Sequence, residues 1–261
     1  MFTHLMEEDA MRHLSDIMTA QLRRPSAVFK NIIPYIGGRC PLCQELCLAG
    51  SFCAACSEDI LTASDSHQHR CPRCHLALRG LDYCEACYLL KPRYDKLSIA
   101  FDYVQPMKSL VLRYKNSGQL ALAKPFAKLL QARLQRQGIT IPPATLCIPL
   151  PASNQSLKKR GYNPASEIAK ELARLNAWRI DHHSLHRAQG HHSIEQKALD
   201  SVGRRLNVRD LYYCSARLEV PLVILVDDIM TSGATLDSAS QALKAAGVKR
   251  VHAMVLARAS Y

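Results

Sequence analysis

Apolar and polar residues alternate along the second half of the chain in a way typical of an α/β fold. Short apolar runs stand at the positions 98–104, 145–151, 222–226 and 250–256. Segments with apolar residues at helical spacing lie between or beside them, at 107–114, 120–137, 164–175 and 236–246. A run that is apolar at every position fits a strand buried on both faces of a parallel sheet. We therefore expect an α/β domain on a parallel sheet over residues 93–261.

The first 36 residues read as a separate helical extension. Apolar residues recur at helical spacing from Met11 to Leu22, with acidic residues before them. This extension, residues 1–36, could dock on the body of the protein, on a partner or on a membrane face. No run of 18 apolar residues is present, and the N-terminus is acidic where a signal peptide is basic. We expect no transmembrane segment and a cytoplasmic location, with peripheral binding at the inner membrane as an option.

Eight of the 11 cysteines form four C-x-x-C pairs. The pairs are Cys40/Cys43, Cys53/Cys56, Cys71/Cys74 and Cys84/Cys87. In the cytoplasm such a set favours metal sites over disulfides, and the spacing within each half allows a hairpin that completes a tetrahedral site. Proximity assigns one Zn²⁺ to the first four cysteines and a second to the last four, although the spacing also allows crossed pairing. Residues 37–92 are thus predicted to form a double zinc ribbon, an internal repeat with two structural zinc ions that supply much of its folding energy.

The excess positive charge lies entirely on the second part of the chain. The net charge is +12; residues 1–100 hold 11 basic and 11 acidic residues, and residues 101–261 hold 23 and 11. Zinc ions bound by four thiolates would make the cysteine-rich part acidic. A basic domain attracts nucleic acid through counterion release, and it is equally typical of an enzyme that binds phosphates.

The stretch 222–236, LVILVDDIMTSGATL, carries the most specific pattern in the chain. A buried strand runs into two acids, then into small hydroxylated residues around one glycine, and then into a helix. Free backbone N–H groups in such a turn form a pocket for one phosphate at the helix N-terminus. The carboxylates suit hydroxyl groups, or a metal ion, attached to that phosphate. A ribose 5-phosphate meets both demands, whereas the alternative is an ordinary βα turn of a Rossmann-like sheet.

The same stretch resembles the phosphoribosyl-pyrophosphate (PRPP) signature of type I phosphoribosyltransferases. The resemblance implies that Asp227 and Asp228 hold the ribose hydroxyls, and that Mg²⁺ binds together with PRPP. It also implies that the 5-phosphate is bound by Thr231, Ser232, Gly233, Ala234 and Thr235. The glycine-rich loops GxGxxG and GxxxxGK[ST] do not occur in the sequence.

A basic stretch at 152–163 stands between a predicted strand and a predicted helix. As a βα loop it belongs at the carboxyl edge of the sheet, where open α/β sheets bind ligands. Lys158, Lys159 and Arg160 would then face the same crevice as the phosphate pocket, and a pyrophosphate leaving group needs such positive charge. The alternative is a solvated run of charge.

The sequence KKRGYNPA at 158–165 resembles the RGFNQ loop of the ComF family, bacterial competence proteins that join an N-terminal zinc ribbon to a phosphoribosyltransferase-like domain. Tyr114-Lys115 stands where that family has L-K-[FY], and the segment 196–207 resembles its Q-x-x-L…R-x-x-N. The resemblance covers about residues 38–258 and departs at Pro164, where the family usually has Gln. It adds further residues to the basic loop as ligands of pyrophosphate or DNA, namely Lys115, Tyr162, Asn163, Arg204 and Arg205.

Two functions follow from this resemblance. The first is a competence protein that binds PRPP or a related phosphate and handles single-stranded DNA, alongside DNA-translocation proteins at the inner membrane face. The second is an active Mg²⁺-dependent phosphoribosyltransferase with an unknown acceptor. The basic second domain favours the first function. So does the short sequence after the last predicted strand, which we expect to be too short for a hood over a base acceptor. The acidic pair and its turn favour the second.

Overall fold

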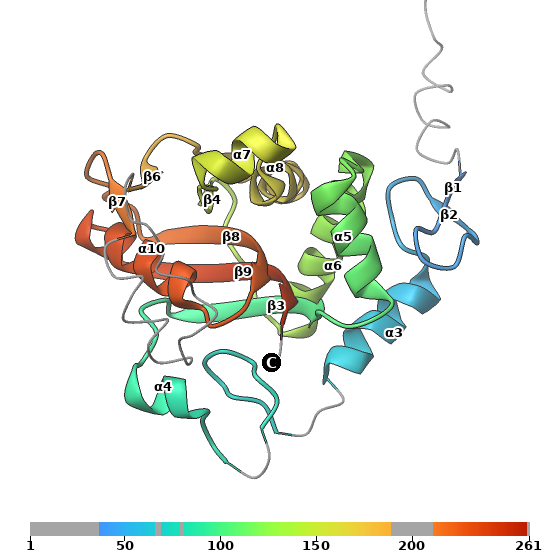
Figure 1. Ribbon diagram of the computed structural model, residues 1–261, viewed down its shortest axis with the longest axis horizontal. Coiled ribbons are helices and arrows are strands. Elements are labelled where there is room, and N and C mark those ends of the chain that lie inside the picture. Colours follow the sequence, from blue (N-terminus) through green and yellow to red (C-terminus); the bar gives the residue numbers. More distant parts are fainter. Residues whose placement is uncertain (1–36, 66–68, 79–80, 189–210, 260–261) are drawn as a thin grey trace, which may run out of the picture.

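The computed structural model describes residues 37–65, 69–78, 81–188 and 211–259, arranged around one central sheet (Figure 1). The helix expected near 11–22 and the segment 196–207 lie outside these residues. Among the helices that the structure describes, none combines the length and the hydropathy that a membrane span requires.

Five parallel strands form the central sheet, in the order β3-β9-β8-β4-β5. Their bounds are β3 Lys96–Asp102, β4 Leu146–Pro149, β5 Arg179–Ile180, β8 Leu222–Met230 and β9 Arg250–Arg258. The prediction of an α/β fold on a parallel sheet is therefore confirmed. β8 runs further than the predicted 222–226, because its pairing with β9 continues until Met230 lies opposite Arg258. The acidic pair accordingly lies within the paired strand and not after it.

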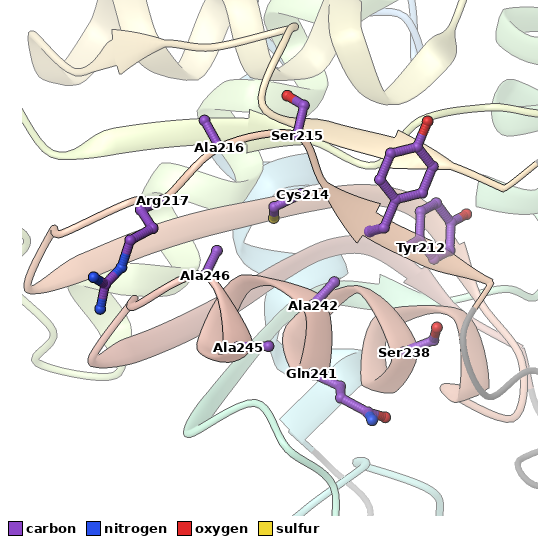
Figure 2. A pocket seen from close by; sticks show the side chains of 11 residues that line it. Tyr212, Cys214, Ser215, Ala216, Arg217, Ser238, Gln241, Ala242, Ala245 and Ala246 are labelled. Atoms are coloured by element: carbon purple, nitrogen blue, oxygen red, sulfur yellow. The ribbon is translucent and has the colours of Figure 1, made fainter.

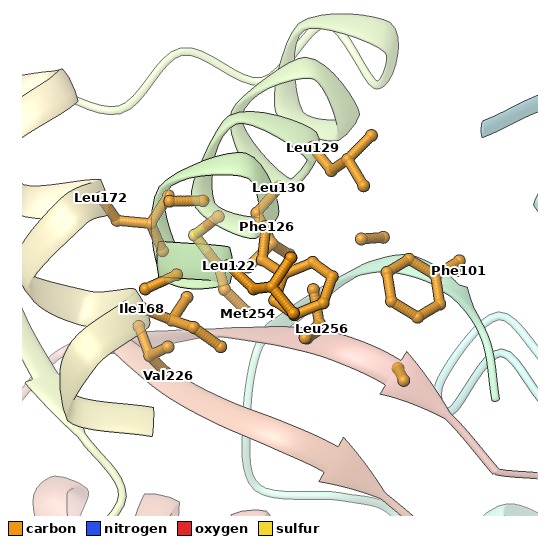
Figure 3. Packing of buried hydrophobic residues seen from close by; sticks show 14 of the residues in the cluster. Phe101, Leu122, Phe126, Leu129, Leu130, Ile168, Leu172, Val226, Met254 and Leu256 are labelled. Atoms are coloured by element: carbon orange, nitrogen blue, oxygen red, sulfur yellow. The ribbon is translucent and has the colours of Figure 1, made fainter. Parts of the chain in front are cut away.

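One face of the sheet is covered by helices that follow β3 and β4. They are α5 Met107–Asn116, α6 Ala123–Arg136, which follows the 3-10 turn η2 Leu120–Leu122, and α8 Pro164–Asn176. Figure 3 shows Phe126 and Leu130 of α6 and Ile168 of α8 packed over this face, where Val226 of β8 and Met254 of β9 meet them. Ile224 belongs to the same core.

The other face of the sheet carries α10 Ala234–Ala245 and a small antiparallel pair, β6 Leu185–Arg187 with β7 Tyr212–Cys214. Val223 and Leu225 of β8 join this second core, together with Leu236 and Leu243 of α10. Even-numbered residues of the buried part of β8 thus point to α6, and odd-numbered residues point to α10, as the two-residue period of a strand requires.

The expected loop at 152–163 contains a short helix, α7 Asn154–Arg160, so this part of the prediction was wrong. Ser153 caps the helix by accepting a hydrogen bond from the Ser156 N–H at 3.1 Å, and Gly161 ends it with φ of +79°. No residue of α7 is buried. A helix of seven residues without a buried face leaves no apolar periodicity for a sequence reading to find.

The cysteine-rich part consists of two short units. The first has the hairpin β1 Gly37–Arg39 and β2 Leu46–Leu48, followed by α3 Ala54–Asp65; the second has a single bridge between Arg70 and Ala77, followed by α4 Glu85–Leu89. Cys40 and Cys56 of the first unit join the core under α6, whereas the four cysteines of the second unit join the core under α10. The two units therefore lie on opposite faces of the sheet.

Candidate functional site

Asp228 lies near the carboxyl end of β8 and points to the α6 face. Its Oδ2 forms an ion pair with Nζ of Lys115 in α5 at 2.8 Å, and the two side chains are only 13% and 17% exposed. The other carboxylate oxygen accepts a hydrogen bond from the Ile229 N–H at 2.7 Å. The structure thus brings Lys115, more than a hundred positions earlier in the chain, into contact with the acidic pair.

Asp227 lies near Tyr212 of β7. Its Oδ1 accepts a hydrogen bond from the Asp228 N–H at 2.8 Å. Burial raises the pKa of Asp227, the charge of Asp228 raises it further, and Lys115 opposes both. Tyr212 lies close enough that Asp227 adds to the rise in its pKa, which burial dominates and Arg187 opposes. A half-buried acid of this kind suits a ligand that donates hydrogen bonds, as sugar hydroxyls do.

The turn between β8 and α10 consists of Thr231, Ser232 and Gly233. Gly233 has φ of +78°, and a Cβ atom at this position would lie 2.5 Å from Cε of the buried Met230, so the turn favours glycine. Ser232 Oγ accepts a hydrogen bond from the Ala234 N–H at 3.3 Å. Ala234 and Thr235, predicted as turn residues, form the first turn of α10. Backbone N–H groups at a helix start are the groups that bind phosphate in proteins.

The basic stretch lies in the last turn of α7. Lys158 and Lys159 are exposed and Arg160 is half-buried. Burial raises the pKa of Tyr162, while the charge of Arg160 lowers it and that of Asp228 raises it. Tyr162 therefore lies between the basic stretch and the acidic pair.

Tyr162 and Asn163 both bind the backbone around this edge of the sheet. The Tyr162 hydroxyl donates to the carbonyl of Tyr114. Asn163 Nδ2 donates to the Leu150 carbonyl at 2.9 Å, and its Oδ1 accepts from the Ala165 N–H at 3.2 Å, which caps α8. Asn163 thus connects the end of β4 with the start of α8. Arg204 and Arg205 lie outside the described residues.

Arg258, at the carboxyl end of β9, is a site residue that the sequence reading missed. It is only 4% exposed. Its Nη1 donates to the carbonyls of Thr231 at 2.5 Å and Met230 at 3.3 Å, and its Nε donates to the carbonyl of Cys74 at 2.9 Å. The sequence shows only an arginine at the end of an apolar strand, which periodicity cannot distinguish from an exposed one.

The eight paired cysteines gather into two clusters, as proximity in the sequence predicted. One holds Cys40, Cys43, Cys53 and Cys56, the other Cys71, Cys74, Cys84 and Cys87, and in each the Sγ atoms lie within 4.8 Å of one another. Tetrahedral zinc with Zn–S bonds of about 2.3 Å needs sulfur atoms about 3.8 Å apart. The Sγ atoms of Cys43 and Cys53 are 3.7 Å apart, and those of Cys74 and Cys84 are 3.5 Å apart. Both donor sets therefore fit Zn²⁺.

The internal repeat is visible in the backbone of the two units. The N–H of Cys40 binds the Glu45 carbonyl and that of Cys71 binds the Leu76 carbonyl, both at 2.8 Å. Gln44 and His75, each four residues after the first cysteine, both have positive φ. Each accepts a hydrogen bond on its carbonyl from the arginine that precedes the first cysteine, Arg39 or Arg70, at 3.0 Å. The units share one knuckle geometry.

An open groove of about 470 Å³ runs between β7 and α10 (Figure 2). Two polar atoms on the α10 wall, Ser238 Oγ and Gln241 Oε1, are buried without a hydrogen-bond partner. On the β7 side, the exposed Tyr213 stacks on His186 with ring centroids 5.2 Å apart. The groove shares α10 with the turn of Thr231, Ser232 and Gly233 but contains none of the residues predicted from the sequence.

Comparison with known proteins agrees with this arrangement. A family model described as "Phosphoribosyl transferase domain" matches residues 156–260. Competence protein F of Haemophilus influenzae is 27% identical over 231 residues, covering 85% of this chain and 91% of that protein. DNA utilization protein YhgH of Escherichia coli (strain K12) is 25% identical over 234 residues, covering 85% and 98%. Competence protein ComFC of Streptococcus pneumoniae is 26% identical over 208 residues, covering 78% and 87%. Two four-cysteine clusters before a phosphoribosyl transferase domain, with similarity along most of the chain, make this protein a homologue of competence proteins F and ComFC, as its resemblance to the ComF family predicts.

Proposed function

We propose that the protein binds PRPP, or a related sugar phosphate, at the turn after β8, and that it handles single-stranded DNA during DNA uptake. One observation carries the first part: two acids at the carboxyl end of a central strand lead directly into a glycine turn that opens α10. The names of the relatives, which refer to competence and DNA utilization, support the second part.

The acidic pair, the turn and Lys115 each have a place in this proposal. Asp227 and Asp228 accept hydrogen bonds from the ribose hydroxyls, and the N–H groups of Thr231 to Thr235 hold the 5-phosphate. Mg²⁺ enters as part of the substrate, where it neutralises the pyrophosphate. Lys115, already paired with Asp228, supplies a cation that would also bind a pyrophosphate oxygen. Two Zn²⁺ ions, one in each cysteine cluster, stabilise the N-terminal units.

The PRPP proposal is tested by calorimetry with PRPP and Mg²⁺ on the wild type and on the double variant Asp227→Asn/Asp228→Asn. The variant should lose PRPP binding and keep the circular dichroism spectrum of the wild type. A matched control, Glu45→Gln/Asp59→Asn, removes two exposed carboxylates outside the site and should leave PRPP affinity unchanged. Unchanged affinity in the double aspartate variant would show that the sugar binds elsewhere.

The DNA proposal rests on the exposed end of α7. Lys158 and Lys159 are exposed and can meet a phosphodiester backbone, and Tyr162 lies near both Arg160 and Asp228. Backbone contacts add little sequence preference, and each contact with a single strand adds about 0.7 to the slope of log affinity against log salt. DNA-translocation proteins at the inner membrane face are the partners that this role needs, with the protein working from the cytoplasm.

Anisotropy titrations with a labelled single strand at several salt concentrations test this role. Replacing Lys158, Lys159 and Arg160 by alanine should flatten the salt slope by about two units, from three lost contacts. The control replaces Arg217, Lys249 and Arg250, three other exposed cations of the same domain, and should leave the slope as in the wild type. A slope that stays unchanged in the first variant moves the DNA path away from α7.

An active phosphoribosyltransferase is the second candidate function, and the acidic pair with its turn favours it. A pyrophosphate-release assay over a set of nucleobases, with PRPP and Mg²⁺, distinguishes the two. Release that depends on one base and disappears in Asp227→Asn/Asp228→Asn identifies an enzyme and its acceptor.

A further inference from the structure

The second cysteine unit lies close to the turn of Thr231, Ser232 and Gly233, the proposed phosphate turn. The Tyr94 hydroxyl donates to the carbonyl of Arg73, which lies between two cysteines of this unit, at 3.0 Å. The same hydroxyl lies 3.8 Å from the place of a Cβ atom on Gly233. Arg70 of this unit also binds Asp102 at the carboxyl end of β3, with 2.6 Å between Nη2 and Oδ2. The unit is thus attached to the edge of the sheet at which the turn begins.

Arg258 makes the most direct connection between the two. Its guanidinium group binds the carbonyl of Cys74 on one side and those of Met230 and Thr231 on the other. A guanidinium carries its donors in a rigid plane, so these three carbonyls are held in one geometry. Cys74 is a predicted metal ligand, and Thr231 is the first residue of the turn.

The first cysteine unit is attached through a similar arginine on the other face of the sheet. Arg133 of α6, 5% exposed, donates to Asp65 Oδ1 at 2.5 Å and to the carbonyls of Leu61 and Ala100 at 3.2 Å. Its contacts run from α3 to β3, and among the described residues they do not include the turn. The two units therefore have arginine attachments of the same kind with different destinations.

We propose that Arg258 is a positioning residue, which fixes the phosphate turn against the second cysteine cluster, so that loading of this cluster, and not of the first, sets the affinity of the turn for its ligand. The identity of the ligand rests on the proposed function, whereas the effect of Arg258 on the order of the turn does not depend on it. An empty second cluster lets the Cys74 carbonyl shift. The guanidinium follows it, and the backbone of Met230 and Thr231 loses its fixed place.

The test compares Arg258→Met with Arg133→Met in the full-length zinc-loaded protein. Three quantities are measured: zinc content, hydrogen exchange of the backbone amides 231–235, and PRPP affinity by calorimetry. We expect Arg258→Met to keep two zinc ions, to exchange faster at the turn and to bind PRPP at least about tenfold more weakly, within the usual range of coupling between sites. Arg258→Lys, which keeps the charge but not the planar fork, should lie between Arg258→Met and the wild type. Arg133→Met should leave the turn and the affinity as in the wild type.

A second pair of variants separates the clusters themselves. Cys84→Ser and Cys53→Ser remove one predicted ligand at equivalent positions of the two units, and only Cys84→Ser should speed exchange at the turn and weaken PRPP binding. The proposal is overturned by wild-type exchange and affinity in Arg258→Met, or by equal losses in Arg258→Met and Arg133→Met. Should the wild type bind no PRPP, the proposed function fails, and exchange at the turn still decides the role of Arg258.

Discussion

Breaking the ion pair between Lys115 and Asp228 should reveal how the protein keeps two acids side by side before a ligand arrives. The variant Lys115→Met retains a long apolar stem and removes the cation. Asp228 is then a mostly buried carboxylate beside Asp227, which is itself half-buried. Removing one partner of a buried pair costs about 3 to 5 kcal/mol, because the other charge is left uncompensated.

The upper end of that range is limited by proton uptake. Protonating an ordinary aspartate at neutral pH costs about 4 kcal/mol, since each pH unit above its usual pKa of about 3.9 adds about 1.4 kcal/mol. A stranded carboxylate therefore cannot destabilise the fold by more than this amount. We expect Lys115→Met to lower the free energy of unfolding by about 3 to 4 kcal/mol at pH 7.

Urea unfolding followed by circular dichroism measures this loss, with zinc content checked in each variant. The decisive control is the double variant Lys115→Met/Asp228→Asn. Since Asp228→Asn removes the stranded charge, it should stabilise the Lys115→Met background while it destabilises the wild type or leaves it unchanged. Two single effects that simply add would show that the pair is screened by water and would refute this account.

Three further predictions concern other parts of the molecule. Metal analysis of protein purified without chelator should find two zinc ions per chain; one or none contradicts the two-cluster assignment. The folded pKa of Asp227 is raised above its unfolded value, so the wild type should lose stability relative to Asp227→Asn as pH rises from about 4 through neutrality. The same pH dependence of the free energy of unfolding in both proteins, measured in urea, would exclude this. His252 is buried and binds Ser98 at 2.8 Å; burial, and then Lys96, lowers its pKa to about 4. As pH falls from about 6.5 to 4, the wild type should therefore lose up to about 3 kcal/mol of its free energy of unfolding. The variant His252→Gln, which has no titrating ring, should not show this loss.

The sequence predicted the parts of the fold that depend on local periodicity and spacing. The strands around 222–226 and 250–256, the helix at 164–175 and the grouping of the eight cysteines were all correct, because each follows from residues close together in the chain. The turn after β8 was predicted from its glycine and hydroxyl residues, and its place before α10 is confirmed.

Other features depended on contacts between distant segments, which no local pattern specifies. The partner of Asp228 is Lys115, which the family resemblance placed near the pyrophosphate but not against the acid. Arg258 and the attachment of the second cysteine unit to the turn follow from the register of β9 with β8. The two units lie on opposite faces of the sheet. Both precede β3 in the sequence, so their placement depends on packing against strands that come later in the chain.

The central place of β9 has a consequence for the order of folding. β3 is an edge strand whose neighbour is β9, and Ser98 meets His252 across 154 positions of the chain. During synthesis, therefore, the edge strand and the apolar faces of both cysteine units exist long before the strand that completes the sheet. Contacts this far apart form slowly, whereas a cluster of four cysteines within 17 positions closes early. Zinc bound at these clusters would then stabilise the growing chain before the sheet is complete, and zinc shortage during synthesis should lower the yield of folded protein.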